Sequence, residues 1–189
     1  MGRMLINLIA FQLCWLAAVV GAANAMPYLG PLFAVVWLPI HLLATKSSAR
    51  TEAMLILAAG ALGYVLDSVL VLGGWMSFPP QARLGAPSTV WMVTLWLGFA
   101  ATLRHGLGWL RGRYLLGALL GAVAGPLAYW GGSRLGAVIL TEAVPSLLVV
   151  GVEWLIAMPL LLGLVTLLER ARAGRPGNGV AAVARQEST

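Results

Sequence analysis

The chain has 189 residues, of which 60% are hydrophobic and only 10% are charged, and its mean hydropathy is +0.90. Soluble domains are roughly 45–50% apolar and about 25% charged, so this composition excludes an ordinary soluble globular protein. It also excludes a disordered chain, because such chains are polar and poor in aromatic residues, whereas this one has 8 tryptophans. The class that remains is an all-α protein with several transmembrane helices.

The net charge of +6 does not indicate a nucleic-acid partner, because Lys and Arg stand singly or in pairs between long apolar runs and form no basic patch. We interpret these cations as signals of membrane topology. The single cysteine, Cys14, lies inside an apolar run, so no intramolecular disulfide can form and the residue is expected to pack as a small hydrophobe.

Six apolar runs are long enough to cross a bilayer, which needs about 20 residues of helix. In chain order they cover residues 4–23, 28–45, 53–74, 89–110, 114–131 and 147–168. We therefore predict one bundle of six transmembrane helices over residues 1–169, followed by a disordered basic tail over residues 170–189. The interval 132–146 is too short to cross and is predicted to be an interfacial or re-entrant segment.

The first run has an alternative interpretation as a signal peptide, since Ala23-Asn24-Ala25 matches a cleavage pattern. The run is longer than the apolar core of a typical signal peptide, and it carries Asn7 and Gln12 in its first half. We therefore expect a retained helix. Cleavage would change the number of helices but not the orientation of the others.

The positions of the cations predict that both termini are cytoplasmic. In that orientation nine cations lie on the inner side, and these are Arg3, Lys46, Arg50, Arg111, Arg113, Arg170, Arg172, Arg175 and Arg185. Only Arg83 and Arg134 lie outside. Such a bias is typical of a multi-pass protein with an even number of helices.

Glycines at helical spacing indicate which faces are buried against other helices. The fifth run carries Gly117, Gly121 and Gly125, followed by Pro126. This ridge is interpreted as a packing surface, with a kink at the proline. In the third run Gly60 and Gly63 fall on the same stripe as Asp67, so the carboxylate of Asp67 is expected to point into the bundle.

Ionisable residues within apolar runs are candidates for function, because they are costly in the bilayer. Asp67 and Glu153 lie at matched depth, about 9–10 Å inside the outer boundary, and could share a proton or a cation. Tyr64, Thr94 and Tyr129 are candidate hydrogen-bond partners by depth and type.

A second polar layer lies within roughly 10 Å of the inner boundary. It contains Asn7, His41, Glu52, Arg104 and His105. Two histidines and a carboxylate are possible metal ligands, but these lie on separate helices without a short ligand spacing, so we expect no metal site and no cofactor. Arg104 is expected to reach lipid headgroups, and Asn7 to bond between helices.

The tryptophans near the ends of the predicted helices are expected in the interfacial aromatic belts, and these are Trp75, Trp91, Trp109 and Trp130. None of the familiar nucleotide-binding, hydrolase or metalloprotease motifs occurs in the sequence.

Several short patterns together resemble a bacterial membrane-protein family known as domain of unknown function 2878. They are Asn7 and Trp15, Glu52, Gly63-Tyr-Val-Leu-Asp67, Pro87-Ser-Thr-Val-Trp91, Leu95-Trp96 with Phe99, and Gly125-Pro126-Leu-Ala-Tyr129. The resemblance covers about residues 4–168. It implies a location in the bacterial inner membrane and carries over no catalytic residue.

Three functional hypotheses remain. The first is a structural or partner-binding membrane protein that contacts lipids and either another membrane protein or a second copy of itself. The second is a small proton- or cation-coupled transporter that uses Asp67 and Glu153. The third is a lipid-modifying enzyme with His41, Glu52 and His105 at the inner leaflet. We favour the first, and an enzyme is the weaker expectation.

Overall fold

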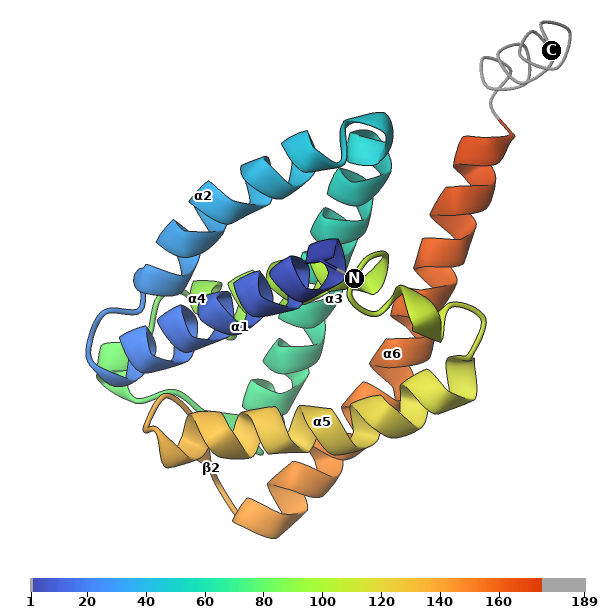
Figure 1. The fold of residues 1–189 in the computed structure, drawn as a ribbon. Coiled ribbons are helices and arrows are strands. Elements are labelled where there is room, and N and C mark those ends of the chain that lie inside the picture. The colour runs from blue at the N-terminus through green and yellow to red at the C-terminus, as the bar shows by residue number, and fades with distance from the viewer. Residues whose placement is uncertain (1, 175–189) are drawn as a thin grey trace, which may run out of the picture.

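The structure is a computed structural model that describes residues 2–174, and it is an all-helical bundle (Figure 1). Its described residues form six α-helices: α1 (Gly2–Ala23), α2 (Leu29–Ala44), α3 (Ala49–Leu72), α4 (Val90–Leu103), α5 (Tyr114–Arg134) and α6 (Ala143–Ala173). Two strands, β1 (Met76–Ser77) and β2 (Ile139–Leu140), and three short 3-10 turns complete it. The all-α prediction is confirmed.

Four of the helices are long and apolar enough to cross a membrane, namely α1, α3, α5 and α6. The helices α2 and α4 are apolar but have only 16 and 14 residues. At about 1.5 Å per residue they are roughly 24 and 21 Å long, which is less than the roughly 30 Å of hydrocarbon in a bilayer. The membrane character predicted from the composition thus rests on four helices.

The helix predicted over residues 89–110 is shorter than expected, because α4 ends at Leu103. The carbonyl of Thr102 accepts the backbone N–H groups of both His105 and Leu107, at 3.1 and 2.8 Å, and this closes the helix. Two glycines in the five residues after Leu103 also disfavour continuation. This early end turns the chain so that the side chain of His105 faces α3.

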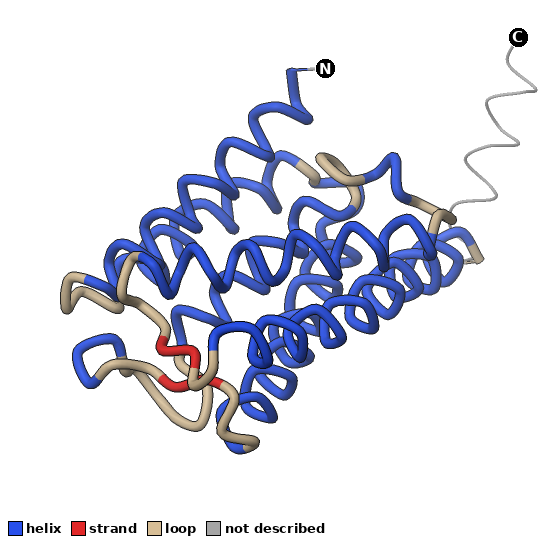
Figure 2. The backbone as a smooth tube through the Cα atoms, turned by 90° about the horizontal axis from the view of Figure 1, so that it is seen from below, coloured by secondary structure: helices blue, strands red, loops and turns tan. Residues whose placement is uncertain are grey.

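The interval predicted to be an interfacial or re-entrant segment contains the end of α5, strand β2 and the start of α6. β2 pairs antiparallel with β1, with Met76 opposite Leu140 and Ser77 opposite Ile139. Figure 2 shows this ribbon at one end of the bundle. It joins the α3 to α4 connection to the α5 to α6 connection, and α6 begins four residues earlier than the predicted helix.

Trp91 was predicted in an interfacial aromatic belt because of its position near a helix end, but it lies in the core. Its side chain is fully buried, packs edge-to-face against Phe78 at 5.7 Å between ring centroids, and donates a hydrogen bond from Nε1 to the Ala82 carbonyl at 2.8 Å. Its indole N–H is satisfied by the long loop before α4, so this loop is a packed part of the fold.

The glycine ridge of α5 faces α6. A Cβ atom on any of its glycines would lie closer than 2.7 Å to a side chain of α6: Leu162 for Gly117, Met158 for Gly121, and Trp154 for Gly125. The glycines therefore allow the two helices to approach closely. Pro126 lies inside α5, directly after this ridge.

The tail predicted from residue 170 is helical as far as Ala173, the last residue of α6. Residues 175–189, which include Arg175 and Arg185, lie outside the described residues.

Candidate functional site

Asp67 is fully buried in the C-terminal third of α3 and joins three helices. Its Oδ2 accepts a hydrogen bond from Nε1 of Trp96 on α4 at 2.8 Å, and its Oδ1 accepts one from the hydroxyl of Tyr129 on α5. Both donors are uncharged. Buried polar groups must be hydrogen-bonded to be tolerated, and here each carboxylate oxygen has a donor.

Glu153 on α6 is the second carboxylate of this centre, with 7% of its surface exposed. It lies close enough to Asp67 for the two groups to interact electrostatically. Neither of its carboxylate oxygens has a hydrogen-bond partner among residues 2–174, and the same holds for the buried Nε1 of the adjacent Trp154. We call Asp67, Trp96, Tyr129, Glu153 and Trp154 the Asp67 centre.

Glycines set the positions of the two indole rings in this centre. A Cβ on Gly63 would lie 2.0 Å from Cγ of Trp96, and a Cβ on Gly125 would lie 2.3 Å from Cγ of Trp154. Because glycine has no side chain at either position, the two indoles can stack, with 4.6 Å between ring centroids and an interplanar angle of 12°. The glycine stripes that the sequence marked as packing surfaces thus seat the aromatic rings beside Asp67.

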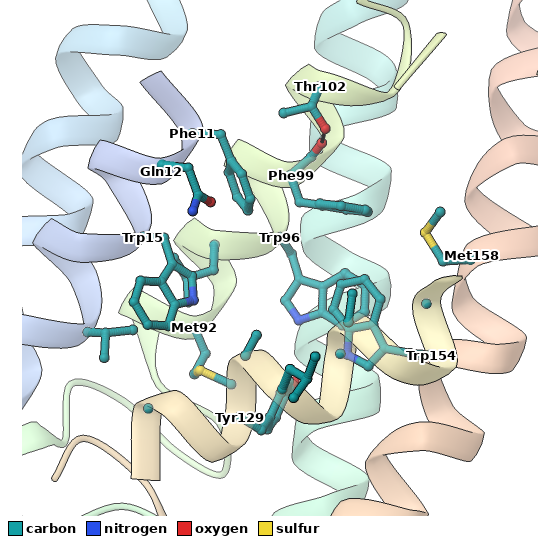
Figure 3. A pocket seen from close by; sticks show the side chains of 18 of the residues that line it. Phe11, Gln12, Trp15, Met92, Trp96, Phe99, Thr102, Tyr129, Trp154 and Met158 are labelled. Atoms are coloured by element: carbon teal, nitrogen blue, oxygen red, sulfur yellow. Dashed lines mark hydrogen bonds between the residues drawn. The ribbon is translucent and has the colours of Figure 1, made fainter. Parts of the chain in front are cut away.

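A cavity of about 750 Å³ lies next to this centre, between α1, α4, α5 and α6. Its lining is almost entirely apolar and aromatic. Trp15 on α1 faces it from one side, and the stacked rings of Trp96 and Trp154 face it from the other (Figure 3). Gln12 lies at its rim with an exposed side chain, and the cavity is partly open to the surface. Pockets of this volume and character are typical of small-molecule sites.

The cavity and the buried acid share side chains. Trp96 and Tyr129 each present a ring to the cavity and donate their polar hydrogen to Asp67 behind it. Any molecule that displaces one of these rings must therefore change the hydrogen bonding of Asp67.

The second predicted polar layer forms a separate cluster around Glu52, in the first turn of α3. Its carboxylate is fully buried; Oε1 accepts from Nη1 of Arg104 and lies 2.9 Å from Nε2 of His105, and Oε2 lies 3.5 Å from Nε2 of His41. Nε2 of each histidine and the carboxylate lie within 4.8 Å of one another, so these three groups could hold a metal ion.

The cluster extends to α6 through Glu169. Its Oε1 accepts from Nε of Arg104 at 3.0 Å and lies 3.1 Å from Nη2 of Arg111. Arg104 was expected to extend to lipid headgroups, but it bridges two carboxylates with only 10% of its side chain exposed. We call His41, Glu52, Arg104, His105, Arg111 and Glu169 the Glu52 cluster.

Three other predicted polar residues bond elsewhere. Asn7 on α1 donates from Nδ2 to the Ala101 carbonyl of α4 at 3.1 Å, which is the interhelical use expected of it. Tyr64 donates to the Ala86 carbonyl at 2.9 Å, and Thr94 donates to the Val90 carbonyl within its own helix. Of the three partners suggested for the acids, only Tyr129 bonds to one.

Sequence reasoning missed Trp96 as a hydrogen-bond donor and Glu169 as a member of the Glu52 cluster. A tryptophan in an apolar helix gives no signal of a polar partner. Glu169 could have been found, since it and Arg104 both lie near the predicted inner boundary of the membrane.

The family model described as protein of unknown function, DUF2878, matches residues 4–160, and the chain therefore belongs to this family. The comparisons with curated proteins and with solved structures gave no match.

Proposed function

We propose that the chain is a multi-pass integral membrane protein that binds a membrane-soluble, largely apolar molecule in its aromatic cavity. The observation that carries this proposal is the cavity of about 750 Å³ whose walls are aromatic and whose rim is partly open. The proposal also retains the orientation expected from the sequence, with both termini cytoplasmic in a bacterial inner membrane.

The distribution of charge supports this orientation. The α2 to α3 connection and the C-terminal end of α6 lie at one end of the molecule, opposite β2 (Figure 1). Among the described residues the first end carries Lys46, Arg50, Arg104, Arg111, Arg113, Arg170 and Arg172, and the opposite end carries Arg83 and Arg134. Reporter fusions after each connection would test the sidedness, and a periplasmic signal from the α2 to α3 connection would contradict it.

The chemistry of the cavity defines its occupant. The walls offer indole, phenyl and thioether surfaces, and α5 places exposed apolar side chains such as Leu120 and Leu127 at the cavity. An occupant therefore enters from the hydrocarbon of the bilayer and is itself mostly apolar. The exposed amide of Gln12 at the rim offers a contact for one small polar group on that molecule.

The test is a cavity-filling substitution with a control on the same helix. Ala124 lines the cavity and its neighbour Val123 does not, although both are exposed on α5. Native mass spectrometry of the protein purified from membranes should show bound lipid-sized molecules for the wild type and for Val123→Trp. Ala124→Trp should lose most of them, and equal retention by both variants would contradict binding in the cavity.

A fluorescence measurement gives an independent readout. Four of the eight tryptophans line the cavity, namely Trp15, Trp91, Trp96 and Trp154. In nanodiscs that contain brominated lipids, a lipid bound in the cavity should quench the fluorescence of these tryptophans. This quenching should be stronger in the wild type than in Ala124→Trp, although the variant has one more indole. If no molecule is retained and quenching does not differ, the structural or partner-binding role expected first from the sequence would be favoured.

Proton or cation coupling through Asp67 and Glu153 is the second candidate, because both oxygens of Glu153 lack a partner within the described chain. Proteoliposomes with an internal pH dye and an imposed potassium diffusion potential would test it. Coupling requires that wild-type vesicles change internal pH faster than empty ones, and that Asp67→Asn abolishes the difference. Equal rates in all three preparations would exclude it.

A further inference from the structure

Both histidines of the chain face the same buried carboxylate. We propose that His41, Glu52 and His105 form a binding site for one divalent transition-metal ion of the zinc class. This site is distinct from the aromatic cavity and does not depend on the function proposed for it.

The spacing of the ligand atoms fits such an ion. Nε2 of His105 and Nε2 of His41 lie 2.9 and 3.5 Å from the two oxygens of Glu52, and the whole set lies within 4.8 Å. Zinc bonds of about 2.1 Å in tetrahedral geometry place neighbouring ligand atoms about 3.4 Å apart. Small shifts of the imidazole rings are therefore enough to admit the ion.

The ligand set comes from three different parts of the fold, so it exists only in the folded bundle. His41 lies in the last turn of α2, Glu52 in the first turn of α3, and His105 in the turn that closes α4. The early end of α4, which the hydrophobic pattern did not predict, brings the third ligand to the other two.

Two imidazoles and one carboxylate are the donors of zinc sites that keep a fourth position open for water or substrate. Here Glu52 is fully buried and His41 nearly so, whereas a third of the His105 side chain is exposed. The fourth position would therefore lie on the accessible side of the cluster, beside His105.

Arg104 is compatible with this assignment as an outer-shell group. Carboxylate ligands of metals are commonly held by a further hydrogen bond, and Arg104 donates one to Glu52 while it pairs with Glu169. Its charge opposes that of the ion, and Glu169 offsets only part of this effect because it also pairs with Arg111. The ion is consequently expected to bind more weakly than it would without Arg104.

The experiment uses the full chain, purified in detergent through an affinity tag without histidine, and titrates it with Zn²⁺ in a calorimeter. The wild type should bind one ion per chain. The double variant His41→Gln with His105→Gln should bind at least ten times more weakly, and Glu142→Gln, an exposed acid beyond the opposite end of α3, should bind like the wild type. Unchanged affinity in the double variant would overturn the proposal.

A measurement on the unaltered protein covers the case in which the double variant does not fold. Because the chain has only two histidines, the electron paramagnetic resonance spectrum of bound Cu²⁺ should show coupling to two imidazole nitrogens. A spectrum without nitrogen coupling, or the absence of any binding, would overturn the assignment.

Discussion

Helix α3 carries two fully buried carboxylates that are stabilised in opposite ways. Glu52, in its first turn, is surrounded by Arg104 and two histidines, so that charge compensates charge. Asp67, 15 residues and about 22 Å further along, receives hydrogen bonds from the neutral donors Trp96 and Tyr129. No ion pair within residues 2–174 involves Asp67.

The difference follows from the surroundings of each acid in the bundle. Near the bundle end, long cationic side chains reach a carboxylate while their heads stay close to water. Deeper in the bundle a cation would itself need compensation, so aromatic donors that are apolar over most of their surface satisfy the acid at lower cost. Glu153 breaks this pattern because its oxygens have neither kind of partner in the described part of the chain.

The largest expected effect comes from Glu52→Gln. The substitution removes the charge that holds Arg104 and leaves a guanidinium buried without its main partner, which costs about 3 kcal/mol. The midpoint of thermal unfolding in detergent should fall by roughly 6–12 °C. Glu142→Gln, on an exposed residue, should leave the midpoint unchanged. Equal midpoints for both variants would mean that Glu52 holds no buried network.

Gly63→Ala tests the Asp67 centre through the hydrogen-bond donor Trp96 and leaves the carboxylate itself unchanged. The added Cβ would lie 2.0 Å from the Trp96 ring, so the indole must move and weaken its bond to Asp67, at a cost of about 2 kcal/mol. Gly163→Ala is the matched control, because open space surrounds that position of α6 and alanine favours a helix. Thermal unfolding should separate the two variants in opposite directions. A stable Gly63→Ala would show that the Trp96 ring is not fixed.

The helices were predictable because apolar runs separated by polar turns are a strong signal, and five of the six predicted ranges agree with the observed helices to within a few residues. The range 89–110 did not agree. Leucines and tryptophans continue through it, and hydropathy carries no information about the carbonyl of Thr102, which closes α4. The pairing of β1 with β2 was also unpredictable, since two-residue strands leave no periodic pattern.

For the candidate sites, the depth of each polar residue could be predicted from the sequence, but the direction in which its side chain points could not. Asp67 and Glu153 were grouped because they have matching predicted depths. His41, Glu52 and His105 were grouped for the same reason. It could not show that His105 turns back toward α3, or that Trp96 bonds to Asp67 from a helix that looked merely apolar. The first fact depends on where α4 ends, and the second on how α3 and α4 pack against each other at Gly63.

Asp67→Asn is expected to have a smaller effect than Gly63→Ala. The asparagine keeps one acceptor oxygen but places an NH₂ group against either Trp96 or Tyr129, both of which are donors in the wild type. The loss of one buried hydrogen bond costs roughly 1–2 kcal/mol. Chemical denaturation in detergent, with Asp67→Ala as the more severe comparison, would measure it. Equal losses for the two variants would mean that the carboxylate geometry does not matter.

Glu153→Gln should have the smallest effect and the opposite sign. No hydrogen bond is lost, because the oxygens of Glu153 have no partner in the described chain, and the neutral amide of glutamine cannot repel Asp67. We expect a gain of up to about 1 kcal/mol, measured by the same denaturation and compared with Asp67→Asn. A clear loss of stability would indicate that a bound cation or a shared proton joins the two acids, because such a bridge would make the second carboxyl group stabilising. That result would favour proton or cation coupling over a purely structural role for the Asp67 centre.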